Sequence, residues 1–175
     1  MSARRPRNVD DAVTGVGLAA GTANIIMQLS WPEVGYGVVE SPVDSGKATL
    51  HPVKRSRTTF TYLAVALWGT DAERRAYRNA VNGPHSQIRS TEGSPVQYRA
   101  FDPELQLWVA ACLYRGLEDV HRAMYPDVDF RGEHGIYEAC HTMGSTLQVP
   151  ADRWPADRDA FEVYVYHLLP GLDVL

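Results

Sequence analysis

The stretch "FDPELQLWVAACLYRGLEDVHRAM", residues 101–124, decides the fold class because it predicts a long amphipathic helix. Asp102 is a suitable N-cap, Pro103 fits the first helical position, and Glu104 places an acid in the first turn. Apolar residues then recur at helical spacing, so one face of this helix is expected to be buried. That face consists of Leu105, Trp108, Val109, Cys112, Leu113, Leu117 and Val120.

Helical patterns also occupy the sequence on both sides of this stretch. We expect helices over residues 10–29, 54–70, 70–81, 133–144 and 155–168, a connector over 33–53, and a polar loop over 90–101. The helix over 54–70 is predicted to be mostly buried, and its inner face would consist of Phe60, Leu63, Ala64, Leu67 and Trp68. Strand-like alternation is nowhere sustained, so the sequence predicts an all-α fold.

Length and composition indicate one domain without a strong charge bias. A chain of 175 residues suits a single compact core, expected over residues 10–168 between tails at 1–9 and 169–175. The formal net charge of −4 gives no electrostatic case for binding nucleic acid or an anionic membrane. No apolar run reaches the about 20 residues of a transmembrane helix. Two cysteines make no disulfide framework, which favours the cytoplasm.

The glycine-rich stretch "GVGLAAG", residues 15–21, resembles a dinucleotide-binding fingerprint. That fingerprint requires a strand before it and a helix after it, because its glycines form a tight turn under a pyrophosphate. The preceding "NVDDAVT" does not have the pattern of a strand. Close packing between helices is therefore the better explanation of these small residues.

Two Glu-x-x-His pairs, Glu118 with His121 and Glu138 with His141, have the spacing used by helical di-iron carboxylate proteins. At about 100° per residue, Glu118 falls nearly opposite the inner face of its helix and His121 falls on the flank. Glu138 likewise points away from the inside of the next helix, marked by Ile136, Cys140 and Met143. We expect both pairs to face outward, which leaves a di-iron site as a minor alternative.

His85 is the histidine whose position calls for an explanation. If the helix continues through Gly83 and Pro84, then Tyr77, Val81 and His85 share one face and the imidazole points inward. An earlier cluster of cations and hydroxyls, residues 54–59, begins the apolar helix. Cations at a helix N-terminus oppose its dipole, so a nearby anionic group, such as the propionates of a haem, would stabilise them.

Several stretches carry a resemblance to a known family. They are "NIIMQLSWPEVGYGVVES", "HPVKRSRTTFTYLAVALWGT", "AVNGPHSQIR" and "SPVQYRAFDPELQLWVAACLYRG", followed by "GSTLQVPADRWPADRDAF". In this order and spacing, over about residues 17–162, the chain resembles the family of the mycophenolate-pathway oxygenase MpaB and the rubber oxygenases, or latex-clearing proteins. The resemblance implies an all-α catalytic domain.

It also implies a b-type haem and an oxygenase that acts with dioxygen on an apolar small-molecule or polymer substrate. The resemblance assigns His85 as the ligand of the haem iron. The family's Arg-x-x-Lys-Thr set corresponds to Lys54, Arg57 and Thr58, so Arg57 and Thr58 would be catalytic residues on the oxygen side of the haem. Lys54 or Arg55 would pair with the propionates.

The chain departs from the family pattern in three respects. Pro84, immediately before the predicted ligand, is not the usual residue there, and it removes a backbone donor. Arg57 stands where the family has a lysine, and because arginine does not release its proton, latex cleavage itself is not implied. The resemblance is expected to fade after Phe161, which would leave the domain without the family's last helices. We then expect the face around Trp108, Cys112 and Leu113 to be partly uncovered and to favour self-association. The alternative function is a non-catalytic helical remnant of the family that binds no haem.

Overall fold

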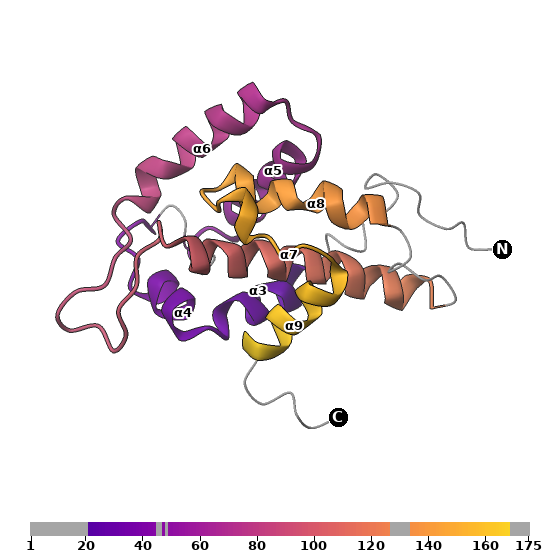
Figure 1. Ribbon diagram of the computed structural model, residues 1–175. Coiled ribbons are helices and arrows are strands. Elements are labelled where there is room, and N and C mark those ends of the chain that lie inside the picture. The colour runs from indigo at the N-terminus through magenta and orange to yellow at the C-terminus, as the bar shows by residue number, and fades with distance from the viewer. Residues whose placement is uncertain (1–20, 45–46, 48, 127–133, 169–175) are drawn as a thin grey trace.

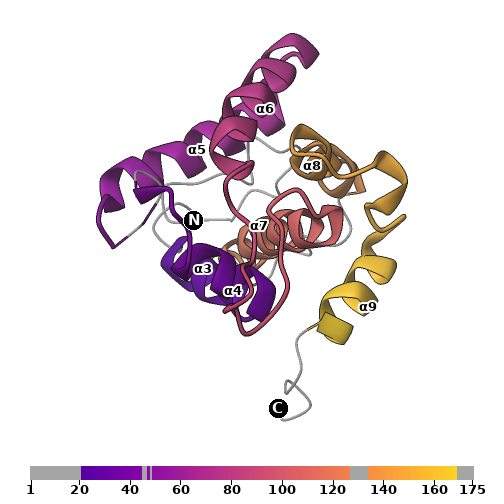
Figure 2. The ribbon, with the colours of Figure 1, turned by 90° about the vertical axis from the view of Figure 1, so that its left-hand side faces the viewer.

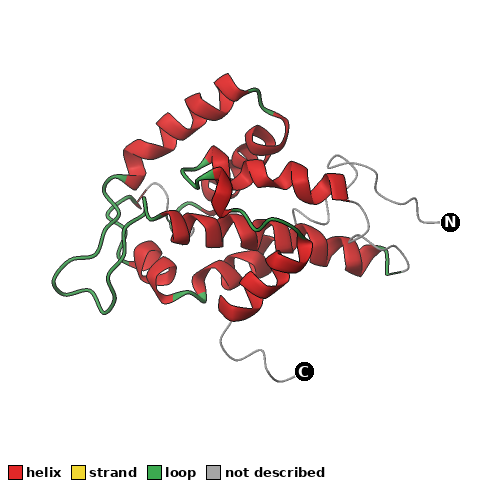
Figure 3. Ribbon diagram, in the orientation of Figure 1, coloured by secondary structure: helices red, strands yellow, loops and turns green. Residues whose placement is uncertain are grey.

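The computed structural model describes residues 21–44, 47, 49–126 and 134–168. The helices are α3 (Gly21–Leu29), α4 (Pro32–Val39), α5 (Pro52–Trp68), α6 (Asp71–His85), α7 (Pro103–Met124), α8 (His134–Thr146) and α9 (Arg158–Leu168), with a short 3₁₀ turn at Ala151–Arg153. Within these ranges there are helices and loops and no strands, so the all-α prediction is confirmed (Figure 3). None of the described helices is long and apolar enough to cross a membrane.

Helix α7 is the centre of the fold (Figure 1). It packs against α3 and against α8. Asp102 caps it, since its carboxylate accepts a hydrogen bond from the Glu104 backbone at 2.9 Å. Trp108, Cys112, Leu117 and Val120 are buried as predicted, but Glu118 and His121 are buried too. The expectation that Glu118 faces outward is therefore wrong: α7 is enclosed on more sides than its apolar stripe covers.

Helix α3 covers the face of α7 that carries Trp108 and Cys112. The Trp108 indole donates to the carbonyl of Gln28 at 3.0 Å, and the Asn24 amide donates to the carbonyl of Cys112. A Cβ atom added at Gly116 would lie only 2.5 Å from Asn24 Nδ2, so the glycine permits this close approach. Trp108 and Cys112 are almost fully buried, so the expectation that this face is partly uncovered is wrong for them, whereas Leu113 is half-buried.

An aromatic cluster joins α7, α8 and α9. Tyr114 lies edge-on to Tyr137 and to Phe161, at centroid distances of 5.2 and 4.8 Å. Trp154, from the connection between α8 and α9, contacts the same group with its ring 5.9 Å from that of Tyr137. Edge-to-face pairs of this kind stabilise a core beyond the burial of their surface. The cluster holds α9 against the rest of the domain.

Helix α6 packs against α5 and α8, on the side of these helices that faces away from α7 (Figure 2). Thr70 begins it with a capping box, in which Thr70 and Glu73 bond each other's backbone N–H groups. The Arg78 guanidinium donates to the carbonyls of Ser145 and Thr146 at the end of α8, where helix carbonyls have no intrahelical partner. The end of α8 is therefore fixed to the middle of α6.

Two predictions about elements are wrong. Pro32–Val39 is a helix, although it falls largely in the predicted connector. Pro32 occupies its first turn, and the negative charge of Glu33 in the same turn interacts favourably with the helix dipole. In α5 the buried residues are Tyr62, Leu63 and Ala66, because this face packs against α6 and α8. Much of the predicted inner face is exposed instead: Phe60, Ala64 and Trp68. The remainder of the helix predicted over 10–29, including Gly15 and Gly17, lies outside the described residues.

Candidate functional site

His85 is the last residue of α6 and is half-buried. The helix continues through Pro84, one residue from its end, where the missing proline N–H costs a single hydrogen bond of the final turn. The backbone then turns at once, with Ser86 N–H donating to Asn82 and Ile88 N–H donating to His85. The His85 ring lies 6.5 Å from the ring of Phe101, in an edge-on orientation. The imidazole is thus held between the end of α6 and a later loop.

The loop between α6 and α7 brings Phe101 back to His85. Backbone hydrogen bonds from Ala100 to Ile88 and from Ser90 to Tyr98 close it, at 3.0 and 2.9 Å. Its middle is tied to α4, because the Tyr98 hydroxyl and Ser94 both donate to the Glu40 carboxylate. These two bonds, from Ser94 and then Tyr98, lower the pKa of Glu40, which keeps the carboxylate ionised. The loop is therefore fixed to the end of α4 as well as by its own backbone hydrogen bonds.

Arg55, on α5, is the cation that interacts with His85. Burial and then the charge of Arg55 lower the pKa of His85 below its ordinary value. Desolvation also lowers the pKa of Arg55, although its side chain keeps contact with solvent. His85 is consequently a neutral imidazole near pH 7, the form that can ligate a metal.

Lys54 and Thr58 lie at the exposed beginning of α5. The Thr58 hydroxyl donates to the carbonyl of Lys54 at 2.9 Å, and the carbonyl of Thr58 accepts from the Tyr77 hydroxyl at 3.0 Å. The second bond ties the start of α5 to α6, on the side where Arg55 interacts with both Tyr77 and His85. Of the predicted site residues, Arg55 and His85 interact electrostatically.

Arg57 lies elsewhere. It lines an open groove of about 630 Å³ together with Pro52, Val53, Ser56, Phe60, Thr61 and Ala64. Two residues apart on a helix corresponds to about 200° of rotation, so Arg57 and Arg55 point from nearly opposite faces of α5. His85 does not line the groove. Arg57 therefore lies on another face of α5 than Arg55, and its predicted role on the oxygen side of the haem, opposite His85, stays a prediction.

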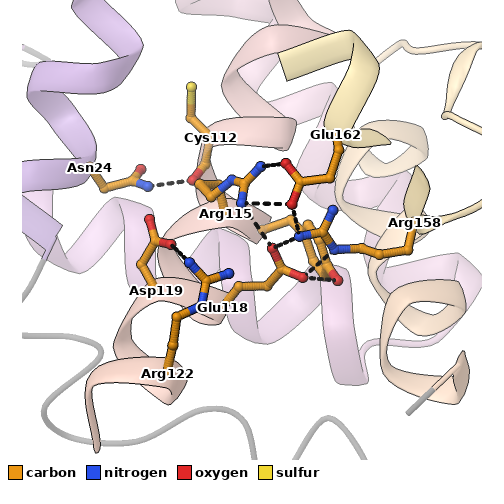
Figure 4. A network of polar contacts seen from close by, with 9 residues as sticks. Asn24, Cys112, Arg115, Glu118, Asp119, Arg122, Arg158 and Glu162 are labelled. Atoms are coloured by element: carbon orange, nitrogen blue, oxygen red, sulfur yellow. Dashed lines mark hydrogen bonds and ion pairs between the residues drawn. The ribbon is translucent and has the colours of Figure 1, made fainter. Parts of the chain in front are cut away.

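A buried ionic network is the main polar feature that the sequence analysis missed (Figure 4). Arg158, from α9, donates to both carboxylate oxygens of Glu118 on α7 and also to Glu162. Arg115 lies between the same two acids, and the Tyr114 hydroxyl donates to Glu118 at 2.8 Å. Two guanidinium groups thus face two carboxylates, which compensates the cost of burying them.

The electrostatics of this network favour its ionised form. Burial opposes ionisation of Glu162, but hydrogen bonds from Arg115 and Arg158 lower its pKa to about 2. Both guanidinium groups also lie over the Phe161 ring, at 5.6 and 5.3 Å from its centroid. The network locks α9 onto α7. The spacings of Arg115 to Glu118 and Arg158 to Glu162, three and four residues, were the available signal in the sequence.

The two Glu-x-x-His pairs do not form a di-iron site. Glu118 is held by arginines inside the core, whereas Glu138 and His141 are exposed on α8. The His141 Nδ1 atom lies 2.6 Å from the carbonyl of Glu138, so the pair interacts within its own helix turn. Within the described ranges, no group of three His, Cys, Asp or Glu side chains is placed to hold a metal ion.

The family described as "ER-bound oxygenase mpaB/B'/Rubber oxygenase, catalytic domain" matches residues 11–174. The chain belongs to this family. The family match runs beyond Phe161, where the resemblance was expected to fade.

The chain is also similar to an uncharacterized protein of Mycobacterium bovis and to an uncharacterized protein of Mycobacterium tuberculosis. Each is 54% identical to the chain over 152 residues, which cover 87% of this chain and 60% of the relative. The chain therefore spans about three fifths of the length of the relatives it matches. No solved structure gives a significant match.

Proposed function

We propose that this chain is a haem-binding oxygenase domain that acts with dioxygen on an apolar organic substrate. The observation that carries the proposal is the half-buried His85 at the end of α6, edge-on to Phe101, at the position where the family resemblance assigns the iron ligand. The charge of Arg55 acts on the same imidazole. A neutral imidazole can serve as the axial ligand of a haem iron, and a nearby cation can pair with a propionate.

The residues around His85 fit one side of a b-type haem. The imidazole would ligate the iron through one ring nitrogen, Arg55 would pair with a propionate, and the Phe101 ring would contact the apolar porphyrin. Lys54, at the exposed start of the same helix, is a second candidate for a propionate. When bound, haem supplies the iron centre at which dioxygen reacts. The protein's part is to hold the imidazole neutral and to keep water from that side of the ring.

The oxygen side fits less well. Arg57 faces the groove on the other side of α5, and Thr58 directs its hydroxyl into its own helix. The role predicted for these two residues next to dioxygen stays a prediction. We propose Arg55, and not Arg57, as the cation of the haem site.

A haem titration of the purified chain tests the proposal. Adding haem to the wild-type protein should produce a sharp Soret band, and His85→Ala should abolish it or shift it to that of loosely held haem. His141→Ala is the matched control, since it removes an exposed histidine from another helix and should leave the band unchanged. Retention of the wild-type band in His85→Ala would show that the ligand is another residue.

The absence of any Soret band from the folded wild-type chain would instead support the alternative function, a helical remnant without haem. Circular dichroism of the same sample shows whether the helices are formed.

A further inference from the structure

One solvent-exposed face of α5 combines apolar side chains with a positive charge. The groove on this face contains Arg57 and exposes Val53 by 81% and Phe60 by 38%. The helix, Pro52–Trp68, contains no Asp or Glu, while Lys54 and Arg57 lie one turn apart. A partner for this face must therefore present apolar side chains together with a negative charge.

The outer face of α9 has these properties. Asp159, Val163 and Tyr166 follow one another at i, i+4 and i+7, so they share one side of the helix. All three are exposed, Val163 by 56% and Tyr166 by 58%. The opposite side of α9 is occupied by the core contacts of Phe161 and Val165 and by the Arg158 ion pairs. The outer face of α9 therefore carries one acidic and two apolar residues, and the opposite side of the helix is fixed to the core.

We propose that the outer face of α9 from a second copy of this chain binds in the α5 groove. Val163 and Tyr166 would pack against Val53 and Phe60, and Asp159 would pair with Arg57. In Figure 2, α5 and α9 lie on opposite sides of the molecule, so the two faces can meet only between different copies. Because the two faces differ, the contact is head-to-tail and extends into a chain or closes into a ring.

The exposed apolar residues of α3 are a weaker candidate for the groove. Ile25 and Ile26 are exposed, but Gly21–Leu29 contains no charged residue to complement Arg57. Charge complementarity therefore distinguishes α9 from α3, and it also provides the test.

Charge reversal on each side tests the contact through the oligomeric state. The average mass of the wild-type chain in light scattering should rise with concentration, with or without added haem. Arg57→Glu and Asp159→Arg each place like charges opposite one another, and each should weaken association roughly tenfold or more. An equimolar mixture of the two variants should associate again, because in both mixed contacts a positive residue faces a negative one.

Phe60→Ser and Val163→Ser remove apolar contact at exposed positions and should also lower the average mass. Circular dichroism of each variant verifies that the fold is intact. A wild-type chain that is monomeric at all concentrations, single variants that associate like the wild type, or a mixture that stays monomeric would each overturn the proposal. Because no readout depends on haem, this result is independent of the proposed oxygenase function.

Discussion

Glu118 on α7 and Arg158 on α9 form a buried, bidentate ion pair between residues forty positions apart in the sequence. Both side chains are almost fully enclosed, and Glu118 is only 1% exposed. A pair of this kind contributes little compared with an apolar replacement, but removal of one partner leaves a charge buried without compensation. The last described helix therefore depends on the central helix for its charge balance.

Glu118→Gln should destabilise the protein by about 3–5 kcal/mol, since Arg115 and Arg158 would then share the single carboxylate of Glu162. Urea denaturation followed by circular dichroism measures this free energy of unfolding. Glu104→Gln is the control, because its ion pair with Arg153 is on the surface and should contribute no more than about 1 kcal/mol. Equal effects of the two substitutions would show that the buried network has no special role.

Glu162 should make the free energy of unfolding depend on pH in the acidic range. Its pKa is lowered to about 2 in the folded protein from an ordinary value of 4.5, so unfolding takes up a proton between these pH values. The contribution of Glu162 is complete above about pH 4.5 and is lost as the pH falls toward about 2. The difference in unfolding free energy between wild type and Glu162→Gln should shrink over this range. A constant difference would contradict the assignment.

The lowered pKa of His85 can be measured without any cofactor. NMR titration should place it below the ordinary value of 6.5, and Arg55→Gln should move it upward by removing a nearby positive charge. Because the unfolded chain takes up this proton more readily than the folded protein, the free energy of unfolding should be unaffected by His85 above pH 6.5 and should decrease as the pH falls below it. Arg57→Gln is the matched control and should leave the titration unchanged, because Arg57 faces the groove. A larger shift in Arg57→Gln than in Arg55→Gln would reverse the proposed roles.

Gly116→Ala should weaken the packing of α3 on α7. The new methyl group would displace the Asn24 side chain and break its hydrogen bond to Cys112, which should cost about 1–3 kcal/mol. Gly135→Ala provides the comparison, since no atom lies within 4 Å of a Cβ at this exposed helical position, and alanine there should be neutral or stabilising. Thermal unfolding of both variants distinguishes these outcomes.

Sequence periodicity predicted the buried residues well where a helix has one apolar face. Ile136, Cys140 and Met143 in α8 are examples, and each is at most 1% exposed. In α5 apolar residues surround the whole helix, so the pattern could not distinguish the buried face from the groove. The burial of Glu118 could not be predicted from α7 alone, because it depends on an arginine supplied by α9.

The candidate site shows the same division. The sequence singled out His85 and the cations near the start of α5, and in the structure the charge of one of these cations, Arg55, acts on the imidazole. Which cation this is depends on the rotation of α5 against α6, set by packing of Tyr62 and Tyr77 and by the bond from Tyr77 to Thr58. Local spacing contains no information about that rotation.

The reactivity of the two cysteines can be used to measure local and global unfolding of the protein. Both are free thiols, buried to 1% exposure or less, and burial raises their pKa values, that of Cys140 to about 12. A thiol reagent attacks the thiolate, so each cysteine should react only when the structure around it opens. Cys112 lies beneath α3, whereas Cys140 lies in the core cluster that spans α5, α7, α8 and α9. The ratio of their labelling rates would therefore separate detachment of a single helix from unfolding of the whole domain.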